Sequence, residues 1–150
     1  MVGQRPALIP DMVVEELRVG AVRDYRIQTV LEADWIERRV LQSPEEITAF
    51  AGFAELLVRR DRNRGEAAVL ALAATCGGVA VLDDGPARQA AKSHGVALRP
   101  TLALICEAIR SRLLTVRVAS ALADALLASS YRLPMGPGGF EKWATDNNLI

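Results

Sequence analysis

A continuous apolar run that ends in two aspartates constrains the fold more than any other feature of this sequence. Val79 to Leu82 are uninterrupted aliphatic residues, typical of a strand buried on both faces, and Asp83 and Asp84 follow at once. A helix is expected from Pro86 to Gly95, and Val96 to Leu98 is a second apolar run. Strand, helix and strand in this order predict a parallel βαβ unit within an α/β domain.

The composition agrees with a short sheet covered by helices. The chain has 150 residues, of which 51% are hydrophobic but only 5% aromatic, so the apolar content is mainly aliphatic. At this length we expect a single domain, residues 1–150, with one core. The formal net charge is zero, with 18 basic and 18 acidic residues, so a polyanion would have to be held by a local basic patch.

Further helices and strands are expected to alternate along the chain. Ser43-Pro44-Glu45-Glu46 has capping-box spacing with proline at the first helical position, which predicts a helix that runs to Leu57. Asp11 is expected to cap a helix that ends at Gly20. The other expected elements are strands at Ala7 to Ile9 and Trp35 to Leu41, and helices at Arg23 to Ala33, Glu66 to Cys76, from Thr101, near Val116 to Ala128 and around Phe140 to Thr145.

The sequence indicates a reducing compartment and no membrane. No apolar run approaches the ~20 residues that a membrane span needs, and MVGQRPALIP lacks the long apolar stretch of a signal peptide. We therefore expect a soluble, cytoplasmic protein. Cys76 and Cys106 lie in apolar stretches and are expected to be two buried, reduced thiols.

Three groups of carboxylates are candidates for chemistry. Asp83 and Asp84 end a strand, Glu66 opens the preceding helix, and Glu15 or Glu16 lies on the helix after the first strand. Converging carboxylates repel one another unless a cation neutralises them, which favours Mg²⁺ or Mn²⁺ and a metal-activated water for phosphodiester hydrolysis. The alternative is structural: Glu66 complements its helix dipole, and Asp83-Asp84-Gly85 makes a turn.

Basic residues gather immediately before the helix that Glu66 opens. Arg59, Arg60, Arg62 and Arg64 could hold the phosphate backbone of single-stranded RNA, and the alternative is a solvated loop. The only histidine, His94, precedes the helix-ending Gly95 and is interpreted as a helix-terminal residue without a catalytic role.

From Ile9 onward, three stretches carry a family resemblance. They are IPDMVVEEL, RNRGEAAVLALA, and GGVAVLDDGPARQAAKSHGV with the following TLALICEAI. The chain resembles PIN-domain proteins, specifically the small stand-alone bacterial and archaeal ones related to VapC-type toxins. The resemblance implies a three-layer α/β fold, a short parallel sheet flanked by helices, and an Mg²⁺- or Mn²⁺-dependent ribonuclease. It also implies that Glu16, Glu66 and Asp84, with Asp83 as the alternative to Asp84, are catalytic metal ligands.

The chain departs from the family pattern at its start. MVGQRPAL contains no acid, so the family's first metal ligand has no counterpart, and Ala68 stands where many relatives carry another glutamate. The family's first strand would lie between the strands at Ala7 to Ile9 and Val79 to Leu82. Its absence predicts unpaired strand edges, at about 1–3 kcal/mol for each unsatisfied buried group. We expect a homodimer, or a protein partner such as an antitoxin, to cover them.

Overall fold

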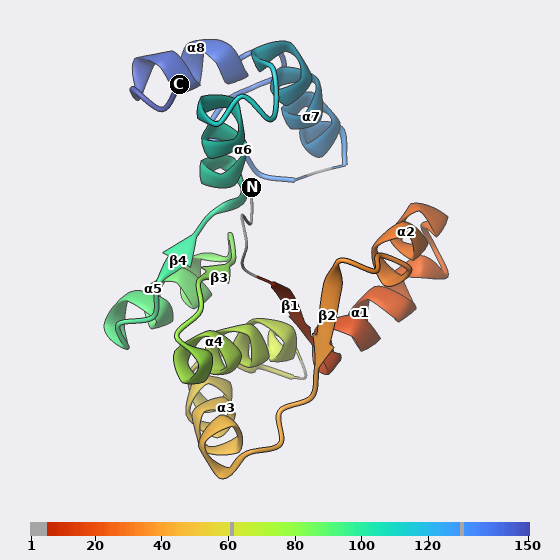
Figure 1. Cartoon of the computed structure of the whole chain (residues 1–150), viewed down its shortest axis with the longest axis vertical. Helices are drawn as coiled ribbons and strands as arrows, with labels where there is room; N and C mark the ends of the chain where they lie inside the picture. The colour runs from red at the N-terminus through yellow and green to blue at the C-terminus, as the bar shows by residue number, and fades with distance from the viewer. Residues whose placement is uncertain (1–5, 61, 130) are drawn as a thin grey trace. The chain divides into compact units, whose positions relative to one another are not determined.

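The computed structural model describes residues 6–60, 62–129 and 131–150 (Figure 1). Contacts divide these residues into two compact units, 6–99 and 100–150. The first unit combines helices with short parallel strands, and the regular elements described in the second are all helices. The predicted α/β class is therefore confirmed.

The first unit contains all the strands that the structure describes. Its elements are β1 (Ala7–Pro10), α1 (Asp11–Ala21), the short helices η1 (Tyr25–Ile27) and α2 (Gln28–Leu31), β2 (Ile36–Arg39), α3 (Pro44–Leu57), α4 (Arg64–Cys76), β3 (Ala80–Val81), α5 (Gly85–Ser93) and β4 (Leu98–Arg99). β1 pairs with β2, β3 pairs with β4, and both pairs are parallel. The second pair, joined by α5, is the predicted βαβ unit.

Helix α3 begins where the capping box predicts. The Ser43 Oγ atom accepts a hydrogen bond from the Glu46 N–H at 3.1 Å, and Glu46 accepts one from the Ser43 N–H at 3.0 Å. A further bond from the Gln42 N–H reaches the same carboxylate at 2.9 Å. Bonds from the backbone of Ser43 and Gln42 favour the ionised carboxylate and lower the pKa of Glu46.

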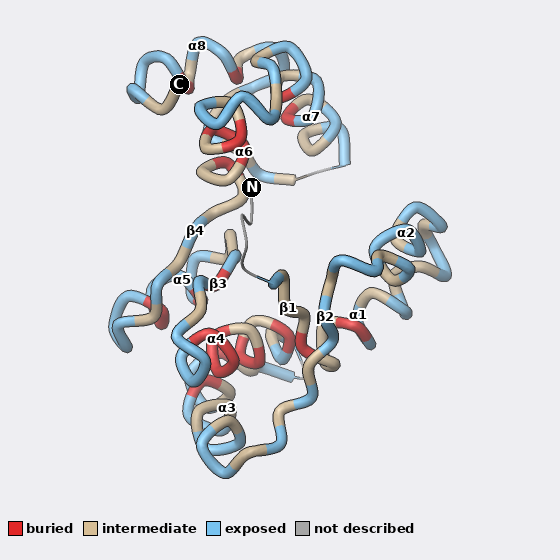
Figure 2. The backbone as a smooth tube through the Cα atoms, viewed as in Figure 1, coloured by how far each residue is buried: buried red, intermediate tan, exposed pale blue. Residues whose placement is uncertain are grey.

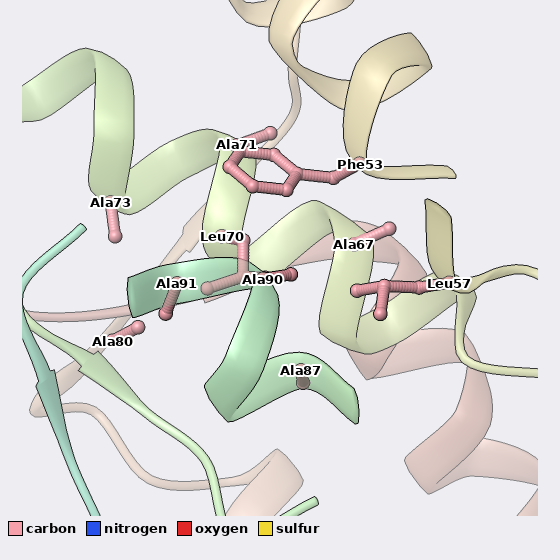
Figure 3. Close-up of a cluster of buried hydrophobic side chains, with 10 residues drawn as sticks. All are labelled: Phe53, Leu57, Ala67, Leu70, Ala71, Ala73, Ala80, Ala87, Ala90 and Ala91. Atoms are coloured by element: carbon pink, nitrogen blue, oxygen red, sulfur yellow. The ribbon is translucent and has the colours of Figure 1, made fainter. Parts of the chain in front are cut away.

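Helix α4 forms the centre of the first core, and most of its length is buried in Figure 2. Such a helix is apolar on nearly all sides, because it has other elements around it. Gly77, with φ of 64°, ends it in the left-handed conformation that glycine adopts without strain. The core shown in Figure 3 consists of Phe53, Leu57, Ala67, Leu70, Ala71, Ala73, Ala80, Ala87, Ala90 and Ala91.

The second unit is built around its own small core. Its helices are α6 (Thr101–Arg110), α7 (Val116–Ala128) and α8 (Phe140–Asp146), close to the predicted bounds. The buried side chains are Leu102, Ile105, Cys106, Ala119, Ala123, Phe140 and Ala144. In the described parts of the chain, no helix of either unit is long and apolar enough to cross a membrane.

Two predicted helix starts are wrong in detail. Pro10 is the N-cap of α1 and Asp11 is the first helical residue, with no side-chain capping bond, because the fixed φ of Pro10 (−63°) and its extended ψ place it just outside the helix. The helix expected from Arg23 is divided into η1 and α2. The Asp24 side chain accepts from the Arg26 N–H and so starts a tight 3₁₀ turn.

Only one of the two cysteines is buried, whereas the sequence predicts that both are. Cys106 is fully buried in the second core, where burial raises the pKa of its thiol. Cys76 is exposed, because it is the last residue of α4 and lies beyond the buried part of that helix. Both thiols are free, as expected.

Candidate functional site

Glu16 extends from α1 to the start of α4. Its Oε1 atom accepts a hydrogen bond of 3.1 Å from the backbone N–H of Gly65, although the two residues are 49 positions apart. This N–H belongs to the first turn of α4, where amide groups lack partners within the helix and attract negative charge. The N-cap residue, Asn63, makes no side-chain capping bond. Glu16 therefore supplies the cap that the local sequence does not.

The glycine at position 65 makes room for this carboxylate. A Cβ atom at that position would lie 2.8 Å from the Oε2 atom of Glu16, closer than side-chain carbons come to other atoms. Glu66 follows directly and is half-buried in the first turn of α4. The Gly-Glu pair thus brings two predicted site residues, Glu16 and Glu66, to the same end of one helix.

Asp83 and Asp84 follow β3, as the sequence predicts, and both are half-buried. Asp84 is the N-cap of α5, and its Oδ2 atom accepts a hydrogen bond of 3.0 Å from the Ala87 N–H. The structural alternative considered for this turn therefore accounts for one oxygen of Asp84. Asp84 has a second carboxylate oxygen, which this bond does not use.

The described residues do not assemble a complete metal site. Within residues 6–60, 62–129 and 131–150, no group of three or more His, Cys, Asp or Glu side chains is placed to hold an ion. Mg²⁺ prefers near-octahedral oxygen coordination and binds through one or two carboxylates together with waters and substrate phosphates. Two acids, Glu16 and Glu66, lie at the same end of α4, and two is a number of carboxylates that such an ion uses.

A family model described as a PIN domain matches residues 3–136. The chain belongs to the PIN-domain family. The match covers most of the chain, including the helix end that carries Glu16 and Glu66 and the turn that carries Asp84. Nuclease-type chemistry is the general activity of this family. No curated protein and no solved structure matched the chain.

Sequence reasoning missed one carboxylate of this PIN domain. The Oδ1 atom of Asp11 is shielded from solvent and has no hydrogen-bond partner among the described residues. Buried carboxylate oxygens are normally hydrogen-bonded, so an unpartnered one is unusual. The position of Asp11, directly after a strand, was the available signal, but the sequence led us to interpret the residue as a helix cap.

Three of the four arginines predicted to contact RNA lie between α3 and α4, and the fourth, Arg64, is the first residue of α4. Arg59, Arg60, Arg62 and Arg64 are all exposed, and the backbones of Arg59 and Arg62 exchange hydrogen bonds of 3.3 and 3.1 Å. Arg60, with φ of 50°, adopts the left-handed conformation of a tight turn. The Arg59 guanidinium donates to the carbonyl groups of Glu55 and Val58 at the end of α3, which is a structural role.

His94 has the structural role that the sequence predicts. It is the C-cap of α5, and its Nδ1 atom lies 3.0 Å from the Ala90 carbonyl oxygen. Its ring meets Phe53 edge to face, with centroids 5.2 Å apart.

A double-mutant cycle tests the contact between Glu16 and Gly65. In wild type, Gly65→Ala displaces the Glu16 carboxylate, and we expect a loss of about 0.5–2 kcal/mol in the free energy of unfolding, the usual cost of losing a helix cap. In the Glu16→Ala background the same change should stabilise by up to about 1 kcal/mol, because alanine exceeds glycine in helix propensity. Urea denaturation measures both. Equal effects in the two backgrounds would show that the contact does not form.

Proposed function

We propose that this PIN domain hydrolyses phosphodiester bonds in RNA at the N-terminal end of α4, with Mg²⁺ or Mn²⁺ as its cofactor. The carrying observation is the bond from the Gly65 N–H to Glu16, which holds that carboxylate at the helix end where Glu66 lies. The amide groups of the first turn favour anions there, both carboxylates and a substrate phosphate. A basic loop directly precedes the same end.

Each candidate residue has a proposed task. Glu16 and Glu66 are ligands for the ion, and Asp84, or Asp83, contributes a further oxygen when RNA and metal are bound. The ion would lower the pKa of a water and offset the charge on the phosphoryl group. Arg59, Arg60, Arg62 and Arg64 would contact the RNA backbone. We propose a cytoplasmic protein, in a toxin–antitoxin pair, that acts as a homodimer or with a protein partner.

A second function is a non-catalytic module that keeps the PIN fold to bind RNA or protein. Two observations favour it: Asp84 already caps α5, and the described acids include no metal-binding group of three. The two functions differ in their response to metal. A catalytic domain gains stability from an ion that binds only the folded state, by about 2.7 kcal/mol at a hundredfold excess over Kd.

Cleavage of a labelled single-stranded RNA with Mn²⁺ or Mg²⁺, together with thermal melts, tests the proposed activity. We expect Glu66→Gln to lose at least about 100-fold in rate, since even outer-shell changes at metal sites cost 10–100-fold. The metal-induced rise in Tm should disappear with it. Glu45→Gln is a matched control, because Glu45 is an exposed acid in the first turn of α3.

Asp84→Asn separates capping from catalysis. Asparagine caps a helix about as well as aspartate, so the melting temperature should change little while activity falls. A wild-type chain that neither cleaves RNA nor responds to several millimolar of either metal would instead support the non-catalytic module. If Glu45→Gln loses as much activity as Glu66→Gln, the proposed role of Glu66 as a metal ligand is wrong.

The salt dependence of RNA binding tests the arginine loop separately. We expect Arg62→Ala with Arg64→Ala to flatten the log–log slope of affinity against salt by about 1.4, because each lost phosphate contact removes about 0.7 for single strands. Arg117→Ala with Arg132→Ala, two exposed positions of the second unit, provides a control of equal charge. Fluorescence anisotropy at several salt concentrations gives the slopes. If both double variants have the same salt slope, the loop does not contact RNA phosphates and is a solvated connection.

A further inference from the structure

Two basic side chains lie next to each other on helix α5. Arg88 and Lys92 are four residues apart, so their side chains are neighbours on the helix surface, and both residues are exposed. In the part of the chain that the structure describes, neither side chain has a hydrogen-bond or ion-pair partner. Lys142, the other lysine of the chain, instead pairs with Asp146 four residues later at 2.6 Å. Arg88 and Lys92 repel each other, and a bound anion would relieve that repulsion.

The rest of α5 does not offset this charge. Its residues, Gly85–Ser93, include no acid. Asp84 lies just before the helix, but its Oδ2 atom accepts a hydrogen bond from the Ala87 N–H and so caps the first turn. The formal net charge of the whole protein is zero, so a polyanion has to be held by a local basic patch. The two cations of α5 form such a patch.

The two cations line a pocket of about 480 Å³, which we name the α5 pocket. This volume is within the range of about 300–1,000 Å³ that is usual for ligand sites. Its walls are one face of α5 and the segment that leads into β4, and this helix and strand lie side by side (Figure 1). The wall near β4 is apolar and half-buried, and none of the lining residues is acidic. The lining residues are Gly85, Arg88, Gln89, Lys92, Val96 and Leu98.

The α5 pocket begins at the turn that carries Asp84. Gly85, the first residue of α5, lines the pocket and directly follows Asp84. From Gly85 to Lys92 the helix rises about 10 Å, because each residue adds about 1.5 Å. A nucleic-acid strand with one phosphate near Asp84 can therefore place a neighbouring nucleotide in the pocket.

We propose that the α5 pocket binds one nucleotide of the substrate RNA, next to the bond that is cleaved, with its phosphate at Arg88 and Lys92. The inference rests on the proposed function, because it takes single-stranded RNA as the substrate. Both side chains carry only hydrogen-bond donors and a positive charge, which suit phosphate oxygens. Gln89 can donate to and accept from a ribose 2′-hydroxyl, and Val96 and Leu98 provide an apolar surface for the base.

Other anionic ligands match the α5 pocket less well. Binding to acidic membranes is typical of clusters of about four to eight basic residues, and this pocket has two. A free phosphate ion would use the two cations but would leave the apolar wall without a ligand. A nucleotide matches both the cations and the apolar wall.

The two lysines of the chain allow a direct test in the wild-type protein. An amine-acylating reagent modifies exposed lysines, and mass spectrometry of peptides measures the rates at Lys92 and Lys142 separately. The probe is a fluorescent single-stranded RNA in buffer without divalent metal, so that it is not cleaved, and anisotropy gives its Kd. At about ten times this Kd, acylation of Lys92 should slow about tenfold, because only the free protein reacts. Acylation of Lys142, which is outside the pocket, should change little.

A substitution in the pocket provides an independent measurement. Arg88→Gln should lower the slope of log affinity against log salt by about 0.7, the share of one phosphate contact in single strands. Arg117→Gln, at an exposed arginine of α7, is the control and should not change the slope. Thermal melts establish that both variants fold, and the acylation of Lys92 decides the question in wild type even if Arg88→Gln does not fold.

The outcomes separate this proposal from RNA hydrolysis. If the protein binds and cleaves RNA but Lys92 is not protected, or if the two variants have equal slopes, the proposal is overturned and the activity stands. Protection of Lys92 without cleavage after metal is added supports RNA in the pocket and contradicts the proposed hydrolysis. Absence of RNA binding overturns both. Equal protection by inorganic phosphate at the same phosphate concentration, or by phosphatidylserine vesicles, assigns the pocket to another ligand and also overturns the proposal.

Discussion

Leu70→Ala should lower the free energy of unfolding by about 2–5 kcal/mol, the usual range for removing a buried leucine from a core. Leu70 is completely buried at the centre of α4, where it contacts the core formed with α3 and α5. The surrounding residues are largely alanines, whose short side chains cannot move to fill the space. The transfer free energy of the removed atoms and the free-energy cost of the cavity left behind therefore add up.

Urea denaturation followed by far-UV circular dichroism measures this loss. Leu56→Ala is a matched control, because Leu56 lies on α3 in the same unit and is 48% exposed. Its effect should stay within about 0.5 kcal/mol, as for most surface substitutions. Equal losses for the two variants would mean that α4 is not at the centre of the core.

Phe140→Ala should cost about 3–5 kcal/mol in the second unit. Phe140 is 1% exposed at the start of α8, and its ring centroid lies 6.2 Å from that of Trp143. The second core is small, so a lost aromatic ring removes a large share of its buried area. Tyr25→Ala, at an aromatic residue 83% exposed, is the control and should have little effect.

Trp143 reports the second unit directly once Trp35 is replaced by phenylalanine. If residues 1–150 form one cooperative domain, as the sequence predicts, Leu70→Ala will also shift the transition seen by Trp143 fluorescence. The transitions measured by fluorescence and by circular dichroism will then coincide. A shift in Phe140→Ala alone would show that the two compact units unfold independently.

Local chemistry made much of the fold predictable. The capping box at Ser43, the glycines after Cys76, and the apolar run that ends at Asp83 each act through neighbours a few residues away, and each element formed where expected. The split of the helix expected from Arg23 was not predictable from periodicity, because the Asp24 side chain competes with the helix for a backbone amide. The residue at which a helix starts therefore depends on single hydrogen bonds of this kind.

The candidate site was only partly predictable from the sequence. The types and order of Glu16, Glu66, Asp83 and Asp84 were sufficient to predict an acidic site, and a PIN-domain family model then matched the chain. The contact of Glu16 with an amide 49 positions away was not foreseen, whereas the bond of Asp84 to its own helix corresponds to the structural alternative considered for that turn. The buried, unpartnered oxygen of Asp11 was also missed, because burial depends on contacts between residues that are distant in sequence.

The sequence by itself determined most of the strands and helices, because these depend on local propensity, capping and apolar periodicity. The resemblance of its stretches to PIN-domain proteins gave the family, which a family model then matched. Only the tertiary structure decided that β1 and β3 stay in separate sheets. It also decided that Gly65 makes room for the Glu16 carboxylate and that Cys76 is exposed. Strand pairing and close approach join residues distant in sequence, and their free energy depends on which surfaces meet.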